Sequence, residues 1–222
     1  MKLLKGVLSI SCTLLLFACF GFVETKEENK QEKVKKEQRG VLEETTVAYF
    51  ASGCFWCVEA IFESLVGVEE AVSGYAGGFT ANPTYKSIGS GKTGHSESVA
   101  VYYDSEKISF ETLVTVFFGS HDPTTVNGQH PDYGSQYRSI AFYETDEEKE
   151  IILNKIKQLN KDLYKGEIVT EVKKLDIFYE AEEYHQDYEK RNPSNSYVQN
   201  VSIPRLNRFK KKFPQLLKSS EH

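Results

Sequence analysis

Two cysteines three positions apart, Cys54 and Cys57, are the residues of this chain whose type and spacing most directly suggest chemistry. They lie in the segment GCFWCVEA at residues 53–60. A C-x-x-C pair is typical of redox chemistry, because two neighbouring thiols can form a disulfide and be reduced again. Half of a metal site and a static structural disulfide are the alternative interpretations.

The histidines do not complete a metal site with these cysteines. A closed zinc site commonly takes four cysteines, or two cysteines and two histidines. The histidines occur singly, without paired spacing: His95, His121, His130, His185 and His222. We therefore expect no bound metal. A structural disulfide that closes so short a loop would add little stability through chain entropy, so the spacing favours a redox pair.

A strand followed by a helix is expected to position the pair. Residues 46–51 are predicted to form a buried strand, Ser52 and Gly53 a turn, and Val58 onward a helix, since apolar residues recur there at helical spacing. Cys54 should lie at or just before the helix N-terminus. Free amides and the helix dipole favour a thiolate there, which lowers a cysteine pKa.

Cys57 should lie on the same side of the first helical turn as Cys54. Their β-carbons would be roughly 5–6 Å apart in a regular helix, whereas a disulfide prefers about 3.8 Å. Closing the bridge must therefore distort the turn. A strained bridge of this kind should be easy to reduce again.

The remaining apolar patterns predict a mixed α and β domain. Strands are expected at residues 68–75, 97–103, 138–143 and 169–179, and helices at 110–120, at 181–191 and from a capping box at Thr145–Glu148. The order β-α-β-β-α-β predicts an α+β fold. Its expected form is a two-layer α/β sandwich with a ferredoxin-like core and extra elements.

Composition limits the possible functions. The chain has 222 residues, 40% of them hydrophobic, which suffices for one domain with a core. A net charge of -5 and a pI near 5.7 argue against nucleic-acid binding. The stretch GSGKTGHSE at residues 89–97 contains Gly-Lys-Thr but lacks the spacing of a phosphate-binding loop. We therefore expect neither a nucleic-acid partner nor a nucleotide.

The N-terminal segment predicts export. Residues 1–19 combine a basic start with a short apolar run and end in Leu-Phe-Ala-Cys, which resembles a bacterial lipobox and makes Cys19 the expected lipid attachment site. Residues 20–44 are rich in Glu, Lys and Gln, and we expect a charged flexible tether. The catalytic domain is expected at 45–218. The domain should be exported and anchored to the cell membrane on its extracytoplasmic side, or else secreted or periplasmic.

Seven segments of the domain carry a family resemblance. They are GCFWCVE (53–59), SGYAGG (73–78), NPTY (82–85), TGHSE (93–97), HDPT (121–124), DYGSQYRS (132–139) and FYEAEEYHQ (178–186). Their types and order resemble peptide methionine sulfoxide reductase A across nearly the whole domain. The resemblance implies an enzyme that reduces the S epimer of methionine sulfoxide, free or in proteins.

The resemblance also implies roles for individual residues. Cys54 matches the nucleophile that attacks the sulfoxide sulfur and becomes a sulfenic acid. Glu97 matches the acid that protonates the sulfoxide oxygen, which requires a raised pKa. Tyr85 and Tyr137 match phenols that hydrogen-bond this oxygen. Asp132 matches an acidic member of the same network, although a carboxylate there could simply order its loop.

The aromatic residues between the cysteines match the substrate pocket. Phe55 and Trp56 correspond to the apolar walls that hold the methyl group of the sulfoxide, a task that suits sulfur-aromatic contact. Two consecutive aromatic residues on a helix cannot both face one core, so at least one should point toward a cleft. For His185 we expect a packed or hydrogen-bonded structural role.

Cys57 is the expected resolving cysteine. Residues 205–222 contain no cysteine, where many members of the family carry the resolving one. We expect Cys57 to attack the Cys54 sulfenic acid and form a disulfide that a thioredoxin-like protein reduces, without a cofactor. The resemblance implies a monomer. Two other functions remain open: a thioredoxin-like oxidoreductase, and a surface lipoprotein that binds a partner without chemistry.

Overall fold

The structure, a computed structural model, describes residues 46–219. The predicted signal segment, Cys19 and the predicted tether lie outside the described residues. Within the described range, no helix has the length and apolar character needed to cross a bilayer.

A six-stranded sheet organises the described residues, in the order β7-β6-β1-β3-β2-β8. The strands are β1 (Thr46–Ser52), β2 (Val68–Ala76), β3 (Ser96–Tyr103), β6 (Ser139–Tyr143), β7 (Glu171–Lys174) and β8 (Phe178–Glu180). Every neighbouring pair is antiparallel except β6 and β7, which are parallel. Strand β1 lies at the centre, where Phe50 pairs with Val99 on one side and Ala141 on the other. The mixed α and β prediction is confirmed.

Helices connect these strands. They are α2 (Phe55–Glu63), α3 (Tyr85–Ile88), α4 (Phe110–Ser120), α5 (Asp146–Leu159), α6 (Tyr188–Arg191) and α7 (Ile203–Lys212). The predicted capping box opens α5, since the Thr145 side chain accepts from the Glu148 amide and the Glu148 carboxylate accepts from the Thr145 amide. A two-stranded hairpin of β4 (Gly128–Gln129) and β5 (Asp132–Tyr133) stands apart from the main sheet.

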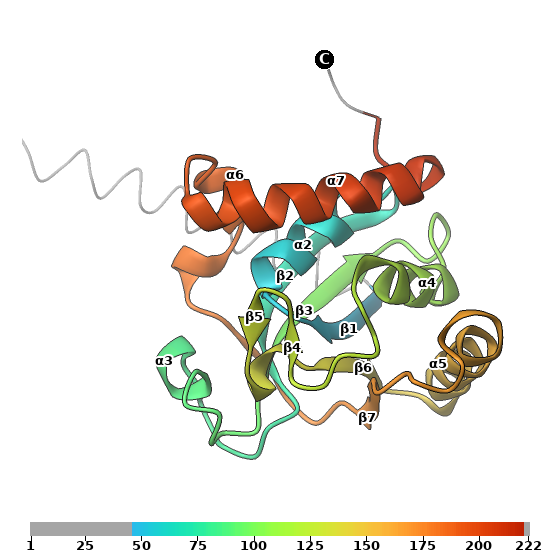
Figure 1. The fold of residues 1–222 in the computed structure, drawn as a ribbon, viewed down its shortest axis with the longest axis horizontal. Coiled ribbons are helices and arrows are strands. Elements are labelled where there is room, and N and C mark those ends of the chain that lie inside the picture. Colours follow the sequence, from blue (N-terminus) through green and yellow to red (C-terminus); the bar gives the residue numbers. More distant parts are fainter. Residues whose placement is uncertain (1–45, 220–222) are drawn as a thin grey trace, which may run out of the picture. The chain divides into compact units, whose positions relative to one another are not determined.

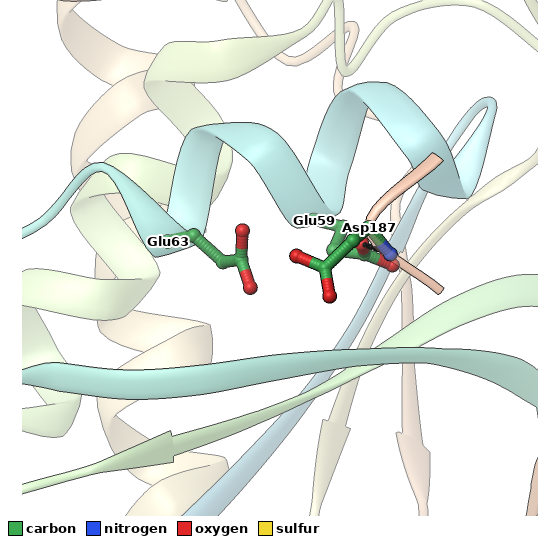
Figure 2. Close-up of side chains that lie close together, drawn as sticks. All are labelled: Glu59, Glu63 and Asp187. Carbon is green, nitrogen blue, oxygen red and sulfur yellow. Dashed lines mark hydrogen bonds between the residues drawn. The ribbon is translucent and has the colours of Figure 1, made fainter. Parts of the chain in front are cut away.

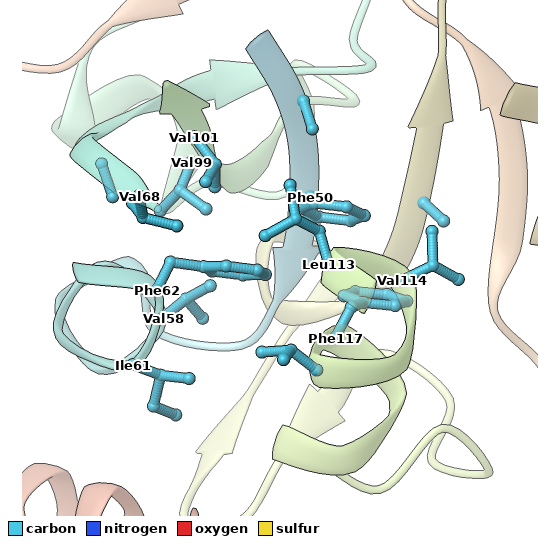
Figure 3. Packing of buried hydrophobic residues seen from close by; sticks show 14 of the residues in the cluster. Phe50, Val58, Ile61, Phe62, Val68, Val99, Val101, Leu113, Val114 and Phe117 are labelled. Atoms are coloured by element: carbon cyan, nitrogen blue, oxygen red, sulfur yellow. The ribbon is translucent and has the colours of Figure 1, made fainter. Parts of the chain in front are cut away.

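The main core lies between the sheet and helices α2 and α4 (Figure 3). The Phe50 ring of β1 stacks on Phe62 of α2 and on Phe117 of α4, each with 5.1 Å between ring centroids. Burying an aromatic side chain of this size contributes about 1.5–3 kcal/mol. These contacts hold the last turn of α2, the helix that begins directly after Cys54, against β1.

Two predicted elements are wrong. Residues 169–179 do not form one strand, because β7 and β8 occupy opposite edges of the sheet. The outer edges of β6 and β2 offer unpaired amides and carbonyls. The first part of this stretch, β7, pairs with β6, and the last part, β8, pairs with β2. Residues 181–191 are not one helix, because a 3-10 turn at Glu183–His185 and α6 are separated by Asp187, whose φ is 51°. No glycine or proline marks either break in the sequence.

Helix α7 is an element that the sequence patterns do not predict. It runs across α2 on the outer side of the helical layer (Figure 1) and also contacts α4. Phe209 of α7 is buried, and the Phe213 ring packs so closely on Gly119 that a Cβ there would lie 2.4 Å from it. The helix therefore adds a layer over the side of α2 on which Cys57 lies.

Candidate active site

Cys54 is the N-cap residue of α2, as predicted, and the helix begins at Phe55 rather than at Val58. The amides of Cys57 and Val58 both donate to the Cys54 carbonyl, which starts the helix. Gly53 precedes the pair with a φ of 91°, and a Cβ there would lie 2.8 Å from Gln129 Cβ. Both thiols are free in the structure. The tight turn at Gly53 therefore places Cys54 at the N-terminus of α2.

Glu97 lies beside this helix start. Its side chain is 2% exposed, and its Oε2 accepts a hydrogen bond from the Phe55 amide at 3.0 Å. Burial raises the pKa of Glu97 to about 8, and the nearby Asp132 charge adds to this, whereas the Phe55 amide acts in the opposite direction. The carboxyl is therefore mostly protonated at neutral pH, which allows it to serve as an acid.

Two tyrosines flank Glu97. Tyr85 opens α3, and Tyr137 ends a 3-10 turn at Ser135–Tyr137. Burial raises the pKa of Tyr85 to about 12, with the Glu97 charge adding and a hydrogen bond to Tyr137 opposing. Burial and the Glu97 charge also raise the pKa of Tyr137. Both phenols therefore stay protonated and can donate hydrogen bonds.

Asp132 connects the surroundings of Glu97 to the Cys57 side of the site. Its Oδ2 accepts a hydrogen bond from the Tyr197 hydroxyl at 2.5 Å, and this hydroxyl lies 4.0 Å from Cys57 Sγ. Burial raises the pKa of Asp132, while the bond from Tyr197 lowers it. Tyr197 is a site residue that the sequence does not reveal, since it stands alone in a polar stretch outside the seven segments.

The pKa of Cys54 shifts in the opposite direction from the prediction. Burial raises the pKa of Cys54 well above its usual range, and the Cys57 thiol and the Glu97 charge add to this. The pKa of Cys57 is lowered to about 6, first by a hydrogen bond from Cys54 and also by the Arg205 charge, against the effect of burial. The expected lowering at Cys54 fails chiefly because the thiol is buried, and burial disfavours its charged form.

An aromatic cluster surrounds the residues between the cysteines. Phe55 is buried, with ring centroids 4.9 Å from His185 and 6.2 Å from Tyr85. Trp56 is half-buried and stacks on Tyr188 with 3.7 Å between centroids. The structure therefore brings both predicted pocket residues to one cluster with Tyr85, and the cluster extends to a segment from the end of the domain.

His185 organises this cluster. It is 1% exposed, and its Nδ1 accepts a hydrogen bond from Trp56 Nε1 at 3.1 Å. Burial lowers the pKa of His185, so the ring is neutral and its proton resides on Nε2. Nε2 is buried and has no hydrogen-bond partner among the described residues. The expected hydrogen-bonded structural role for His185 agrees with this geometry.

Buried polar contacts hold the His185 segment against the sheet. The Glu59 carboxyl, 3% exposed, accepts hydrogen bonds from the Ser73 hydroxyl and the Asp187 amide. The Gln186 side chain accepts from the Ser73 amide and donates to the Ser73 carbonyl. Burial raises the pKa of Glu59 to about 8. These contacts fix the wall of the aromatic cluster to α2 and β2.

Three acidic side chains, one of which is Glu59, lie close together beside these contacts (Figure 2). Carboxylate oxygens of Glu59, Glu63 and Asp187 lie within 4.8 Å of one another. Lys190 Nζ lies 2.5 Å from Glu63 and 2.9 Å from Asp187. The lysine thus compensates the negative charge, and the Glu59 carboxyl already has two donors. These contacts account for the clustering of the three acidic side chains, and no metal ion is needed to explain it.

A cavity of about 550 Å³ reaches Cys57 from the side of α7. Its lining includes Tyr197, Asp132, Arg205, Arg208 and Lys212. The Arg205 guanidinium donates to the Ser52 carbonyl at 2.9 Å and to the Ser120 carbonyl at 3.1 Å. Arg205, which no sequence motif marks, therefore sits against the turn that precedes Cys54.

The chain is similar to known proteins over most of its described length. A family model described as peptide methionine sulfoxide reductase matches residues 46–217. The peptide methionine sulfoxide reductase of Natronomonas pharaonis is 47% identical over 176 residues, covering 79% of this chain and 99% of the relative. That of Trichodesmium erythraeum is 51% identical over 163 residues, covering 73% and 92%.

Solved structures agree. Mxr1 from Saccharomyces cerevisiae in reduced form matches with a TM-score of 0.64 and 32% identity, covering 68% of this chain and 87% of that one. Methionine sulfoxide reductase A of Corynebacterium diphtheriae matches with a TM-score of 0.62 and 34% identity, covering 68% and 76%.

Proposed function

The chain belongs to the family of peptide methionine sulfoxide reductases, and we propose that it reduces the S epimer of methionine sulfoxide, free or in proteins, to methionine. One observation carries the proposal for this site: the Cys54 sulfur lies at a helix start whose first amide is bonded to a buried, neutral Glu97. A nucleophile, Cys54, and a proton donor, Glu97, therefore both lie at the start of α2, where a sulfoxide group could contact both. The identity of the substrate, methionine sulfoxide, rests on the family to which the chain belongs.

The first step transfers oxygen to Cys54. The Cys54 sulfur attacks the sulfoxide sulfur, and Glu97 gives its proton to the sulfoxide oxygen. Tyr85 and Tyr137 donate hydrogen bonds to the same oxygen as charge develops on it. The Cys54 proton passes to Cys57, whose lowered pKa makes it the acceptor of the pair. Methionine leaves, Cys54 becomes a sulfenic acid, Cys57 a thiol and Glu97 a carboxylate.

The aromatic cluster is suited to bind the methyl group of the sulfoxide. Phe55 and Trp56 offer ring surfaces to the methyl group next to the sulfur. Trp56 is held in place by the stack on Tyr188 and by the bond to His185. These restraints favour a fixed pocket, because the walls need not be ordered when substrate binds.

The second step forms the disulfide. Glu97 takes the proton of Cys57, and the Cys57 thiolate attacks the Cys54 sulfur. The hydroxide of the sulfenic acid leaves with the proton returned by Glu97, as water. A thioredoxin-like dithiol then reduces the Cys54–Cys57 disulfide. Asp132 accepts the hydroxyl hydrogen of Tyr197 and so holds the Tyr197 oxygen 4.0 Å from Cys57 Sγ.

Turnover with dithiothreitol tests the function. The purified chain is given the S and the R epimer of methionine sulfoxide separately, with Cys54→Ser as the control. We expect reduction of the S epimer alone and no reduction by the variant. Turnover of neither epimer, or turnover that survives Cys54→Ser, would contradict the proposal and favour a binding protein.

We also propose that the core is of the ferredoxin-like type. The order β6-β1-β3-β2, with α2 joining β1 to β2 and α4 preceding β6, supports this assignment. The edge strands β7 and β8 and the helix α7 are additions to that core.

For residues 1–44 we propose an export signal, lipid attachment at Cys19 and a charged tether, so that a monomeric domain works outside the cytoplasm. The support is the composition of this segment. Globomycin, which blocks lipoprotein signal cleavage, tests it. Normal maturation in treated cells would rule out lipidation at Cys19.

A further inference from the structure

The two sulfurs of the pair have different surroundings. Cys54, 7% exposed, caps α2 on the side of Glu97 and the tyrosines. Cys57, 1% exposed, lies one turn further along α2, where its Sγ faces the Tyr197 hydroxyl. Residues 197–212 cover this side of α2. Cys54 therefore keeps more exposed surface than Cys57, and a protein thiol that approaches from the side of Glu97 meets Cys54 first.

Arg205 places a positive charge on the Cys57 side. Its guanidinium donates to the backbone carbonyls of Ser52 and Ser120 and to the Ser52 hydroxyl. Over residues 46–219, no carboxylate lies within salt-bridge distance of it. Arg205 and Cys57 line the same cavity. A half-buried cation with no carboxylate within salt-bridge distance favours negative charge next to it.

We infer that the external reductant opens the disulfide at Cys54 and expels Cys57 as a thiolate, which the Arg205 guanidinium stabilises. This inference rests on the proposed function and adds the attacked sulfur and a positioning residue. The thiolate of the reductant attacks Cys54 Sγ, the Cys54–Cys57 bond breaks, and the electron pair leaves on Cys57. The second thiol of the reductant, once deprotonated, then releases Cys54, so that the reductant becomes the disulfide.

The chemistry of exchange supports this direction. A disulfide is opened faster when the departing thiol has the lower pKa. The pKa of Cys57 is lowered to about 6, while that of Cys54 is raised. Charged or titratable groups around Cys57 come from several elements: Cys54, Glu97, His121, Asp122, His130, Asp132, Tyr197, Arg205, Arg208 and Lys212. Among these, Arg205 is the cation that acts most strongly on Cys57.

A consequence is that substrate and reductant use one sulfur in turn. Methionine sulfoxide must leave as methionine before the reductant can reach Cys54. The alternative route leads through the cationic cavity beside α7, where a reductant would attack Cys57 and expel Cys54. The two routes leave different sulfurs joined to the reductant.

Trapping of the mixed disulfide distinguishes the routes. The full chain carrying Cys12→Ser and Cys19→Ser is oxidised with diamide, and the Cys54–Cys57 disulfide is verified by peptide mass. A thioredoxin that keeps only its attacking cysteine is added, and released thiols are blocked with N-ethylmaleimide. We expect thioredoxin on Cys54 and maleimide on Cys57. Thioredoxin on Cys57, with maleimide on Cys54, would overturn the inference.

This result is independent of the proposed function, because diamide makes the disulfide without methionine sulfoxide. If methionine sulfoxide fails to produce the same disulfide, the proposed function is wrong, whereas the position of the trapped thioredoxin still tests the inference.

Variants of Arg205 test the stabilising charge. Arg205→Met should slow the opening of the disulfide by thioredoxin several-fold, because a thiol that loses its pKa lowering is a poorer leaving group. It should also move the titration of Cys57, followed by thiolate absorbance, to higher pH. Arg205→Lys should restore both. Arg208→Met, at an exposed residue one turn along α7, is the matched control. An unchanged titration in Arg205→Met would contradict the role of Arg205.

Discussion

The Phe55 amide donates a hydrogen bond to Glu97 Oε2 at 3.0 Å, across 42 positions of sequence. This bond joins the first turn of α2, which carries Cys54, to the start of β3. It fixes the position of the acid relative to the nucleophile. Burial raises the pKa of both groups, so the site holds a protonated acid beside a protonated thiol.

Replacement of the acid should slow the first step strongly. Glu97→Gln keeps an acceptor for the Phe55 amide but removes the proton, so turnover with dithiothreitol should fall about 10²–10³-fold. Thermal unfolding of the variant checks that the fold is retained. A loss of only a few-fold would mean that another group protonates the sulfoxide oxygen.

The pH profile of methionine release should be bell-shaped. Cys57 must be ionised to accept the Cys54 proton, so the rate should rise with pH around 6. Glu97 must be protonated to donate, so the rate should fall above about 8. Because the groups interact, the limbs report the site as a whole. The measurement is kcat/KM at pH 5–10. Glu97→Gln should abolish the descending limb, and a descending limb that persists would contradict its assignment.

Cys57→Ser should separate the two halves of the cycle. The variant should release methionine once per chain, because the Cys54 sulfur is intact, although the first step should be slower without the Cys57 thiolate. It should fail to turn over with thioredoxin, because no disulfide forms. Methionine is counted per chain with and without reductant. Full multiple turnover with thioredoxin would show that Cys57 is not the resolving cysteine.

Trp56→Phe should weaken substrate binding. The phenyl ring of the variant can still stack, but the substitution removes the Nε1 donor. His185 Nδ1 is then buried without a hydrogen-bond partner, which costs about 1–3 kcal/mol of stability. The wall of the pocket loses its fixed position, so KM should rise more than kcat falls. Urea unfolding and steady-state kinetics measure the two effects. An unchanged KM would place Trp56 outside the pocket.

The sequence predicts the elements that carry strong apolar periodicity. Strand β1 and helix α4 appear where their apolar residues indicate, and the capping box at Thr145 and Glu148 opens α5. The stretch 169–179 shows why periodicity is insufficient. Its alternation fits a strand, but the break between β7 and β8 depends on the hydrogen bonds that β6 and β2 leave open at distant edges.

The candidate site shows the same limit. The family resemblance identifies the residues near Cys54, because they occur in contiguous segments. Tyr197 and Arg205 are not identified, since their contacts with Asp132 and Ser52 depend on how α7 packs over α2. The pKa order of the two cysteines is equally inaccessible, because it depends on burial and on the charge that Arg205 places beside Cys57.

Glu59 should make the stability of the fold depend on pH. Burial raises the pKa of its carboxyl to about 8, so the folded state binds a proton that the unfolded state releases above its ordinary pKa near 4.5. This contribution is complete below pH 4.5 and is lost as pH rises through 8. Glu59→Gln should therefore flatten the fall of the unfolding free energy between pH 5 and 9. An unchanged slope in urea titrations would contradict the raised pKa.

The central claim is that Cys54 and Cys57 carry out the oxygen transfer and its resolution together. The most direct measurement is peptide mass mapping of the reduced full chain after one equivalent of the S epimer, without reductant. The account predicts release of one methionine and a peptide in which Cys54 and Cys57 are joined, with two hydrogens lost. Methionine release that leaves both thiols free, or a disulfide that involves another cysteine, would contradict it.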